Sequence, residues 1–134
     1  MRVLLAEDAQ GMRKLISTML QGMGAQEVIV AGDGAEAWNE LDKNDVDLVL
    51  TDWNMPSVDG LELVERVRRS AEFSDLPIIM FTARAAKEDV LKALQSGVDT
   101  YITKPFTPQE LSEKIKTVLN RRGRTAIQRI FSEI

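Results

Sequence analysis

The sequence predicts an α/β fold in which five parallel strands form an open sheet with helices on both faces. Five short apolar runs alternate along the chain with five stretches that have helical spacing. The runs are mostly Val, Ile and Leu with little polar alternation, as in parallel strands that are covered on both faces. Strict alternation is typical of a parallel α/β sheet, and five strands are too few for an eight-stranded barrel. We therefore expect a doubly wound sheet.

The predicted strands and helices follow one another along most of the chain. The strands are residues 3–6, 28–31, 48–50, 78–81 and 101–102. Between and after them, apolar residues recur at the i, i+3, i+4 spacing of an amphipathic helix. These residues are Met12, Leu15, Ile16, Met19 and Leu20, then Ala35, Ala37, Trp38 and Leu41, then Leu61, Leu63, Val64 and Val67, then Val90, Leu91 and Leu94, and finally Leu111, Ile115, Val118 and Leu119.

Glycines and capping residues mark several helix ends. Gly22 ends the first helical pattern and Gly97 ends the fourth, since glycine readily adopts the backbone conformation found just past a helix. At the start of the fifth helix, Thr107 is a candidate N-cap and Pro108 suits the first helical position. Glu110 would then complete a capping box with Thr107.

Composition excludes several kinds of chemistry. The 134 residues include no Cys and no His, which excludes disulfides, thiolate catalysis and phosphohistidine on this chain. A net charge of -4 does not favour nucleic-acid binding, which usually needs a basic excess. No apolar stretch approaches the ~20 residues of a membrane span, and the N-terminus does not read as a signal peptide. We therefore expect a cytoplasmic protein with one domain.

Chemically active side chains follow four of the predicted strands. In open α/β sheets the functional crevice lies at the carboxyl ends of the strands. Each side chain taken alone is typical of a turn, a cap or a solvated surface. Their joint position at one edge is what indicates a site. Glu7 and Asp8 follow the first strand, Asp52 the third, Thr82 the fourth and Lys104 the fifth.

These residue types together favour chemistry on a phosphoryl group. Crowded carboxylates raise one another's pKa, and a bound divalent cation relieves that repulsion. Carboxylate oxygens are ligands that suit Mg²⁺. The sequence indicates no organic cofactor. A metal, an ammonium group and a hydroxyl can together hold phosphoryl oxygens. Asp52 would then be a nucleophile, because carboxylates form aspartyl phosphates.

Four stretches resemble the response-regulator receiver family, above all its stand-alone, CheY-like chemotaxis regulators. They read VLLAEDAQGMRKL, LVLTDWNMPSVDGLELVERVR, PIIMFTARA and YITKPFTPQEL, within residues 2–120. The resemblance implies a flavodoxin-like sheet with the strand order 2-1-3-4-5. It also implies that a receiver domain occupies residues 1–121.

The resemblance assigns a role to each residue of the switch. Asp52 matches the phosphoacceptor, and Lys104 matches the lysine that pairs with the phosphoryl group. Thr82 matches the hydroxyl that moves toward that group. Tyr101 matches the aromatic residue whose rotamer reports the switch, and Pro105 the proline of a cis peptide with Lys104.

The resemblance also assigns the ligands of Mg²⁺. Asp8 and Asp52 match the direct carboxylate ligands, and the backbone carbonyl of Asn54 matches the third protein ligand. Glu7 matches an acidic neighbour that often acts through water. Arg84 and Asn54 occupy the two positions that tune dephosphorylation in the family, so the basic Arg84 leaves the phosphoryl lifetime open.

The implied function is a phosphorylation-activated signalling switch of a two-component phosphorelay. The donor would be a separate sensor histidine kinase, and a target protein would bind the face built by the fourth helix, the fifth strand and the fifth helix. The domain would slowly hydrolyse its own aspartyl phosphate without being a turnover enzyme. The stand-alone form and the sequence WNMP suggest chemotaxis.

Three other functions remain as alternatives. A Mg²⁺-dependent phosphohydrolase would often carry a second Asp where this chain has Asn54. A flavin-binding electron carrier would need a phosphate-binding loop where this chain has the acidic stretch EDAQGM. A receiver-like interaction module that takes no phosphate would not need Asp52, Thr82 and Lys104 together.

Two further expectations concern the tryptophans and the C-terminal tail. Trp53 is expected to be partly exposed beside Asp52, and Trp38 to pack within a helix layer. Residues 122–134 are expected to form a short amphipathic helix, because Ile127, Ile130, Phe131 and Ile134 share one helical face. The sequence leaves open whether this tail packs on its own domain, binds a partner, mediates self-association or is disordered. The oligomeric state is therefore open.

Overall fold

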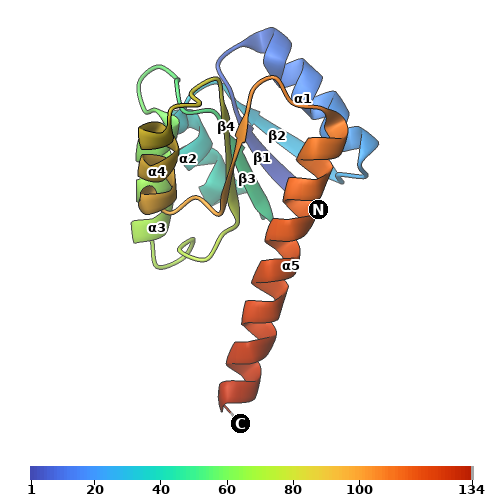
Figure 1. Ribbon diagram of the computed structural model, residues 1–134, viewed down its shortest axis with the longest axis vertical. Coiled ribbons are helices and arrows are strands. Elements are labelled where there is room, and N and C mark those ends of the chain that lie inside the picture. Colours follow the sequence, from blue (N-terminus) through green and yellow to red (C-terminus); the bar gives the residue numbers. More distant parts are fainter. Residues whose placement is uncertain (134) are drawn as a thin grey trace.

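The structure, a computed structural model, describes the backbone of residues 1–133 and the side chains of residues 1–121. Five parallel strands form one sheet in the order β2-β1-β3-β4-β5, which confirms the predicted fold class and strand order (Figure 1). Each predicted apolar run lies within a strand. The strands are β1 (Arg2–Ala6), β2 (Glu27–Ala31), β3 (Leu48–Thr51), β4 (Ile78–Thr82) and β5 (Thr100–Thr103).

Helices cover both faces of the sheet, as predicted. Helices α2, α3 and α4 pack on one face, and α1 and α5 pack on the other (Figure 1). Successive residues of a strand contribute to opposite layers, so Leu4 packs beneath α2 and α3 while Leu5 packs beneath α1 and α5. The helices are α1 (Gln10–Gly22), α2 (Gly34–Lys43), α3 (Gly60–Arg69), α4 (Lys87–Ser96) and α5 (Pro108–Glu133).

The inner strands are buried on both faces, whereas the edge strand β2 is not. Every residue of β3 and β4 is buried, which is why their sequences lack polar alternation. In β2, by contrast, Val30 is 45% exposed, because this strand lies at the edge of the sheet. Apolar composition therefore identified all the strands but did not distinguish the inner ones from β2.

The predicted helix ends at Gly97 and Thr107 are present. Gly97 adopts a left-handed conformation with φ of 114°, and a Cβ atom there would lie 2.7 Å from Cγ of Arg68. Thr107 caps α5 because its Oγ1 accepts a hydrogen bond from the backbone N–H of Glu110 at 3.1 Å. Both residues fix the loops that lead into and out of β5.

Helix α4 lies where the sequence predicts it, but its leucines do not face the core. Leu91 is 48% exposed and Leu94 is 44% exposed. The buried residue of this helix is Ala93, whose small side chain allows α4 to approach the sheet closely. Two large apolar side chains consequently remain on the outer surface of α4.

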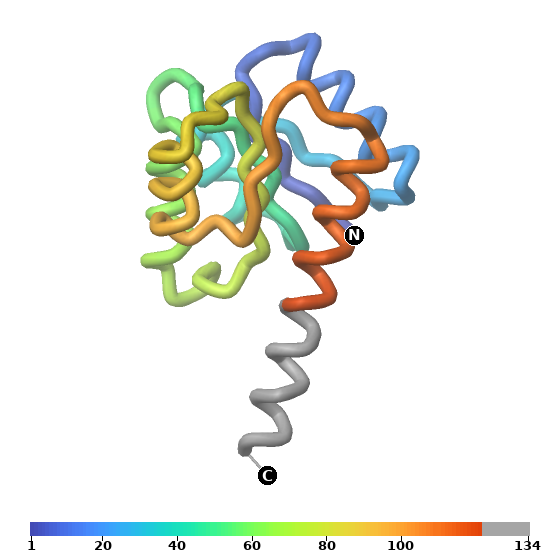
Figure 2. The backbone as a smooth tube through the Cα atoms, in the orientation of Figure 1, coloured from blue at the N-terminus to red at the C-terminus, as the bar shows by residue number. Residues whose placement is uncertain are grey.

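The loops that follow β1, β3, β4 and β5 lie together at the top of the molecule (Figure 2). This grouping follows from the parallel arrangement, since every strand ends at the same edge. Helix α5 begins at this edge.

The amphipathic face predicted for residues 122–134 concerns side chains that lie outside the described residues, so that prediction stands untested. No helix within the described part of the chain is long and apolar enough to cross a membrane.

Candidate functional site

Lys104 connects two of the predicted acidic residues at the carboxyl edge of the sheet. Its Nζ atom donates hydrogen bonds to Oδ2 of Asp52 at 2.7 Å and to Oε1 of Glu7 at 2.9 Å. Burial lowers the pKa of Lys104, but the hydrogen bonds to Asp52 and Glu7, together with the negative charges of these residues, outweigh burial and raise the pKa. The ammonium group is therefore charged and lies between two carboxylates.

The backbone around Asp52 holds its side chain in place. Asp52 is 6% exposed, and its Oδ1 accepts a hydrogen bond from the backbone N–H of Trp53 at 2.6 Å. Its own N–H donates to the carbonyl of Ala6 on β1 at 2.9 Å. Gly60 closes the loop by donating its N–H to the carbonyl of Trp53 at 2.8 Å. Asp52 is thus fixed between the ends of β1 and β3.

Glu7, Asp8 and Asp52 form a compact group of carboxylates. Each offers an oxygen within 4.8 Å of the others. Glu7 is buried and Asp8 is exposed, so the group opens to solvent on the Asp8 side. Like charges at this separation repel one another, so the group is destabilised unless a cation offsets the charge.

The carboxylate of Glu7 is incompletely satisfied. Its Oε2 is buried and has no hydrogen-bond partner among the described residues. Burial is the main reason that the pKa of Glu7 is raised, with a further contribution from the charge of Asp52 and an opposing one from Lys104. An unpartnered oxygen beside two further carboxylates fits a hard cation such as Mg²⁺.

Thr82 lies at the same edge, and its hydroxyl is hydrogen-bonded within the loop that follows β4. Thr82 is buried at the end of β4, and its Oγ1 accepts a hydrogen bond from the backbone N–H of Arg84 at 3.4 Å. Among the described hydrogen bonds, none joins Thr82 to Asp52. The hydroxyl is therefore near the site and bound to its own loop.

Asn54 and Arg84, each two residues beyond a strand-end side chain, contact one another directly. Oδ1 of Asn54 accepts hydrogen bonds from Nη2 of Arg84 at 2.9 Å and from Nε at 3.2 Å. The sequence identified both positions, but no local pattern indicated that their side chains meet. The role of the Asn54 carbonyl as a metal ligand stays a prediction.

The prediction that Trp53 is partly exposed is wrong. Trp53 is only 3% exposed and belongs to the core beneath α2 and α3. The loop folds back at Gly60, which turns the indole inward, and the guanidinium carbon of Arg84 lies 4.4 Å from the centre of the ring. Trp38 packs edge-to-face on Phe73, at 6.0 Å between ring centres, in agreement with its predicted position in the helix layer.

Tyr101 and Pro105 lie on the β5 side of the site. The hydroxyl of Tyr101 donates to the carbonyl of Arg84 at 2.6 Å. Burial, followed by the charge of Asp89, raises the pKa of Tyr101, so the phenol remains a donor. The peptide between Lys104 and Pro105 is cis, as the family resemblance implies.

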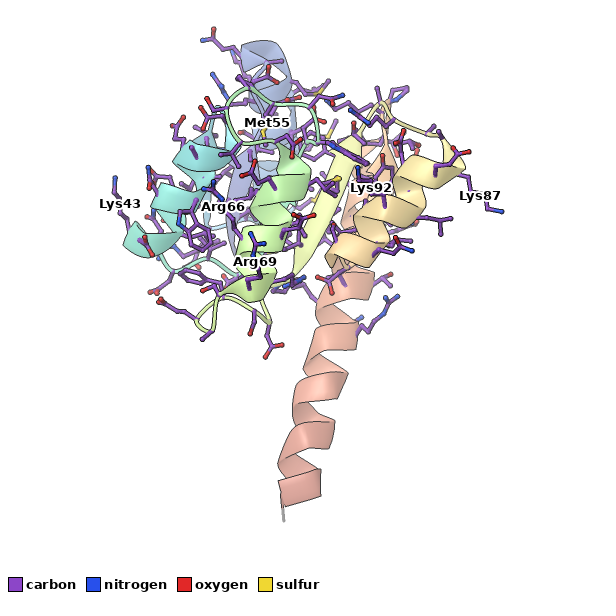
Figure 3. The ribbon with its side chains drawn as sticks, turned by 90° about the vertical axis from the view of Figure 1, so that its left-hand side faces the viewer. Lys43, Met55, Arg66, Arg69, Lys87 and Lys92 are labelled. Atoms are coloured by element: carbon purple, nitrogen blue, oxygen red, sulfur yellow. The ribbon has the colours of Figure 1, made fainter. Side chains whose placement is uncertain are left out.

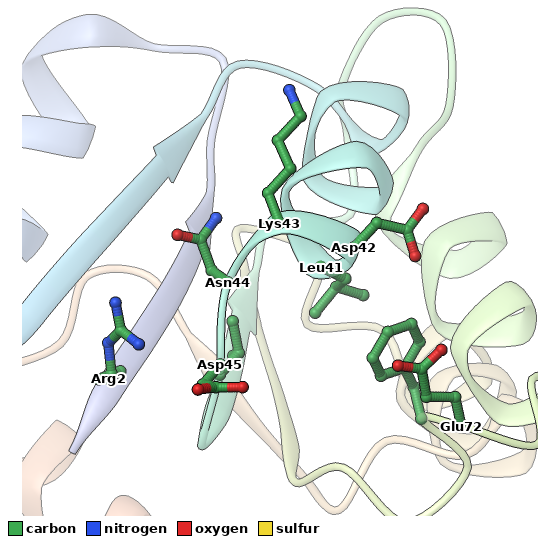
Figure 4. Close-up of a pocket in the computed structure, with 9 residues that line it drawn as sticks. Arg2, Leu41, Asp42, Lys43, Asn44, Asp45 and Glu72 are labelled. Carbon is green, nitrogen blue, oxygen red and sulfur yellow. The ribbon is translucent and has the colours of Figure 1, made fainter.

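A separate pocket of about 440 Å³ lies at the opposite edge of the sheet, where the strands begin (Figure 4). Arg2 lines it together with the loops that precede β3 and β4, including Asn44, Asp45 and Glu72. It contains none of the predicted site residues.

Comparison with known proteins identifies the family of the chain. Residues 3–116 match the response regulator receiver domain. The chain belongs to this family. It is 46% identical over 120 residues to the chemotaxis protein CheY1 of Helicobacter pylori, covering 89% of this chain and 97% of that protein. It is 48% identical over 120 residues to a chemotaxis protein CheY homologue of Campylobacter jejuni, covering 89% of this chain and 92% of the homologue.

Solved receiver structures have the same fold. The chemotaxis protein CheY4 of Vibrio cholerae matches with a TM-score of 0.81 at 32% identity, over 87% of this chain and 97% of that one. A sensor histidine kinase receiver domain from Pseudomonas aeruginosa matches with a TM-score of 0.81 at 29% identity, over 89% and 97% of the two chains. That structure has a magnesium ion coordinated in its active-site cleft.

The family gives the general function of the chain. It is a receiver domain of the CheY-like response regulators, which act as phosphorylation-activated signalling switches in two-component systems. Receiver domains of this kind are signalling proteins rather than turnover enzymes.

Proposed function

We propose that Asp52 accepts a phosphoryl group from a separate sensor histidine kinase in the cytoplasm, in a reaction that requires Mg²⁺. The observation that carries this proposal is the position of the Lys104 ammonium group, 2.7 Å from Asp52 and 2.9 Å from Glu7. A nucleophilic carboxylate beside a fixed positive charge is suited to phosphoryl transfer.

The transfer is an in-line displacement at phosphorus. A carboxylate oxygen of Asp52 forms the new bond to phosphorus, the bond from phosphorus to the donor breaks, and the donor keeps the electron pair. Lys104 and the hydroxyl of Thr82 then bind oxygens of the phosphoryl group. Because Trp53 donates its N–H to Oδ1 of Asp52, the carboxylate is held in one orientation before it reacts.

The Mg²⁺ site would be built from Asp8, Asp52 and the backbone carbonyl of Asn54, with Glu7 acting through water. When bound, the cation would neutralise the carboxylates and part of the phosphoryl charge. The buried, unpartnered Oε2 of Glu7 supports this arrangement, as does the solvent-exposed side of the group at Asp8. The receiver from Pseudomonas aeruginosa provides a precedent, since it holds magnesium in its cleft.

The output would be binding of a target protein to the face formed by α4, β5 and α5. Thr82, Tyr101 and Pro105 would transmit the change to this face. The exposed Leu91 and Leu94 support protein binding, and Lys87 projects into solvent from the first turn of the same helix (Figure 3). The similarity to chemotaxis regulators favours a chemotaxis pathway, and slow hydrolysis of the phosphoryl group on the domain itself would end the signal.

Incubation with acetyl phosphate and Mg²⁺ tests this proposal. Intact mass should show one phosphoryl adduct that is labile to base, and beryllofluoride should change the fluorescence of Trp53. The Asp52→Asn variant should form no adduct, whereas Asp45→Asn, at the opposite edge of the sheet, should behave as the wild type does. An adduct that persists in Asp52→Asn would place the nucleophile elsewhere, and no adduct in the wild type would refute the proposal.

A further inference from the structure

Arg84 contacts several parts of the domain that are expected to move in the switch. Its backbone N–H donates to the hydroxyl of Thr82 at 3.4 Å, and its carbonyl accepts from the hydroxyl of Tyr101 at 2.6 Å. Its side chain reaches the loop after β3 and the first turn of α4. One residue therefore contacts the phosphorylation site, β5 and α4 together.

The guanidinium group of Arg84 makes three kinds of contact at once. It donates twice to Oδ1 of Asn54, covers the ring of Trp53 at 4.4 Å, and pairs with Oδ1 of Asp89 on α4 at 3.5 Å. The ion pair alone is weak, because both side chains are 30–40% exposed. The planar fork of donors and the stacking surface are specific to arginine, and a lysine cannot reproduce them.

We propose that this group, the Arg84 clasp (Arg84 with Trp53, Asn54 and Asp89), is a positioning device that links α4 to the phosphorylation site and opposes the switch. The inference rests on the proposed function of Asp52. If the hydroxyl of Thr82 moves to a phosphoryl group on Asp52, as proposed above, it moves away from the N–H of Arg84, and we infer that the loop after β4 shifts with it. That shift disturbs the contacts of the guanidinium group with the loop after β3 and its contact with α4.

The clasp consequently sets how readily the domain switches. A contact made in only one of two conformations shifts the equilibrium by its differential free energy. Weakening the clasp should therefore loosen α4 before phosphorylation and lower the amount of phosphoryl mimic needed for the switch. Arg84 acts here through Thr82 and α4, not on the reacting atoms.

Amide hydrogen exchange of the unmodified protein without Mg²⁺ tests the link to α4. The N–H of Val90 bonds to the carbonyl of Ala86 in the first turn, so it reports opening of this end of the helix. We expect several-fold faster exchange in Arg84→Ala and Arg84→Lys, and a smaller increase in Asp89→Asn. Glu88→Gln, which removes an exposed carboxylate from the same turn, should exchange as the wild type does. Equal exchange in all five proteins would overturn the proposal.

Titration with beryllofluoride at saturating Mg²⁺ tests the coupling. With Trp53 fluorescence as the signal, Arg84→Ala should reach its midpoint at a several-fold lower concentration than the wild type, and Arg84→Lys should follow Arg84→Ala. Unchanged midpoints would overturn the clasp while leaving the proposed function intact. If the wild type gives neither this response nor an acetyl phosphate adduct, the proposed function itself is refuted.

Discussion

The Nζ atom of Lys104 and the Oδ2 atom of Asp52 lie 2.7 Å apart although 52 positions separate the two residues in the chain. Both side chains are largely removed from water, since the side-chain atoms of Lys104 are 18% exposed and those of Asp52 are 8% exposed. Lys104 also forms an ion pair with Glu7, so a single positive charge offsets the negative charges of two carboxylates. The stability of the metal-free domain therefore depends on this lysine.

Replacing Lys104 with methionine should destabilise the protein most strongly when Mg²⁺ is absent. Removing one partner of a buried ion pair leaves uncompensated charge, which costs on the order of 3 kcal/mol. Urea unfolding at neutral pH in EDTA measures the loss. Added Mg²⁺ should reduce it, because the cation also offsets the carboxylates, whereas an equal loss with and without Mg²⁺ would contradict this account.

Glu7→Gln should stabilise the metal-free protein at neutral pH. Folding raises the pKa of Glu7 above its ordinary value of 4.5, so the folded state favours the protonated form. The stabilisation from this group is complete below that value and is lost as the pH rises through the folded-state pKa. The advantage of the neutral glutamine should therefore be present at pH 7 and disappear toward pH 4.

Thermal unfolding across this pH range provides the measurement for Glu7→Gln. The exposed Glu65 offers a matched control, and Glu65→Gln should follow the wild type at every pH. Glu7→Gln should also gain less stability from added Mg²⁺. A variant less stable than the wild type at pH 7 in EDTA would contradict the assigned cause of the pKa shift.

Gly60→Ala should disrupt the loop that carries Asp52. A Cβ atom at this position would overlap the carbonyl oxygen of Asp52, so the backbone must move. We expect reduced stability and slower adduct formation with acetyl phosphate. Gly11→Ala is the matched control, because nothing lies within 4 Å of its added Cβ, and it should stabilise the helix by about 0.5 kcal/mol. Normal phosphorylation of Gly60→Ala would show that the loop tolerates displacement.

Arg68→Ala should lower stability without altering the chemistry at Asp52. Its guanidinium donates to the carbonyls of Gly97 and Leu76 at 2.8 and 2.6 Å and pairs with Asp99 at 3.0 Å. These contacts join α3 to the loops before β4 and β5, and losing them should cost roughly 3 kcal/mol. Urea unfolding measures the loss, and Arg69→Ala, exposed on the same turn, should be nearly neutral.

The position of the site could be predicted from the sequence because it depends on strand order and direction. Apolar runs locate the strands, and parallel strands bring their carboxyl ends to one edge. Residues as distant as Glu7 and Lys104 therefore meet wherever the chain folds in this way. Caps at Gly97 and Thr107 were predictable for a different reason, since they depend on local backbone geometry.

The contacts around Arg84 could not be predicted in the same way. Arg84 and Asn54 are 30 positions apart, and their side chains meet only because two loops of a particular shape adjoin. The inward rotation of Trp53 depends on the turn at Gly60, and the exposure of Leu91 depends on how closely α4 approaches the sheet. Helical spacing locates a helix along the chain but does not fix which of its apolar residues faces the core.

Because Trp53 is buried beneath Arg84, quenching of its fluorescence can report whether Arg84 still covers the ring. In a Trp38→Phe background the indole is the sole tryptophan, and dissolved iodide should quench it poorly while the guanidinium covers the ring. Quenching should increase once the arginine swings away, even if the emission maximum hardly moves. The extent of quenching by a small anion would thus report opening of the loop directly, without a partner protein or an attached dye.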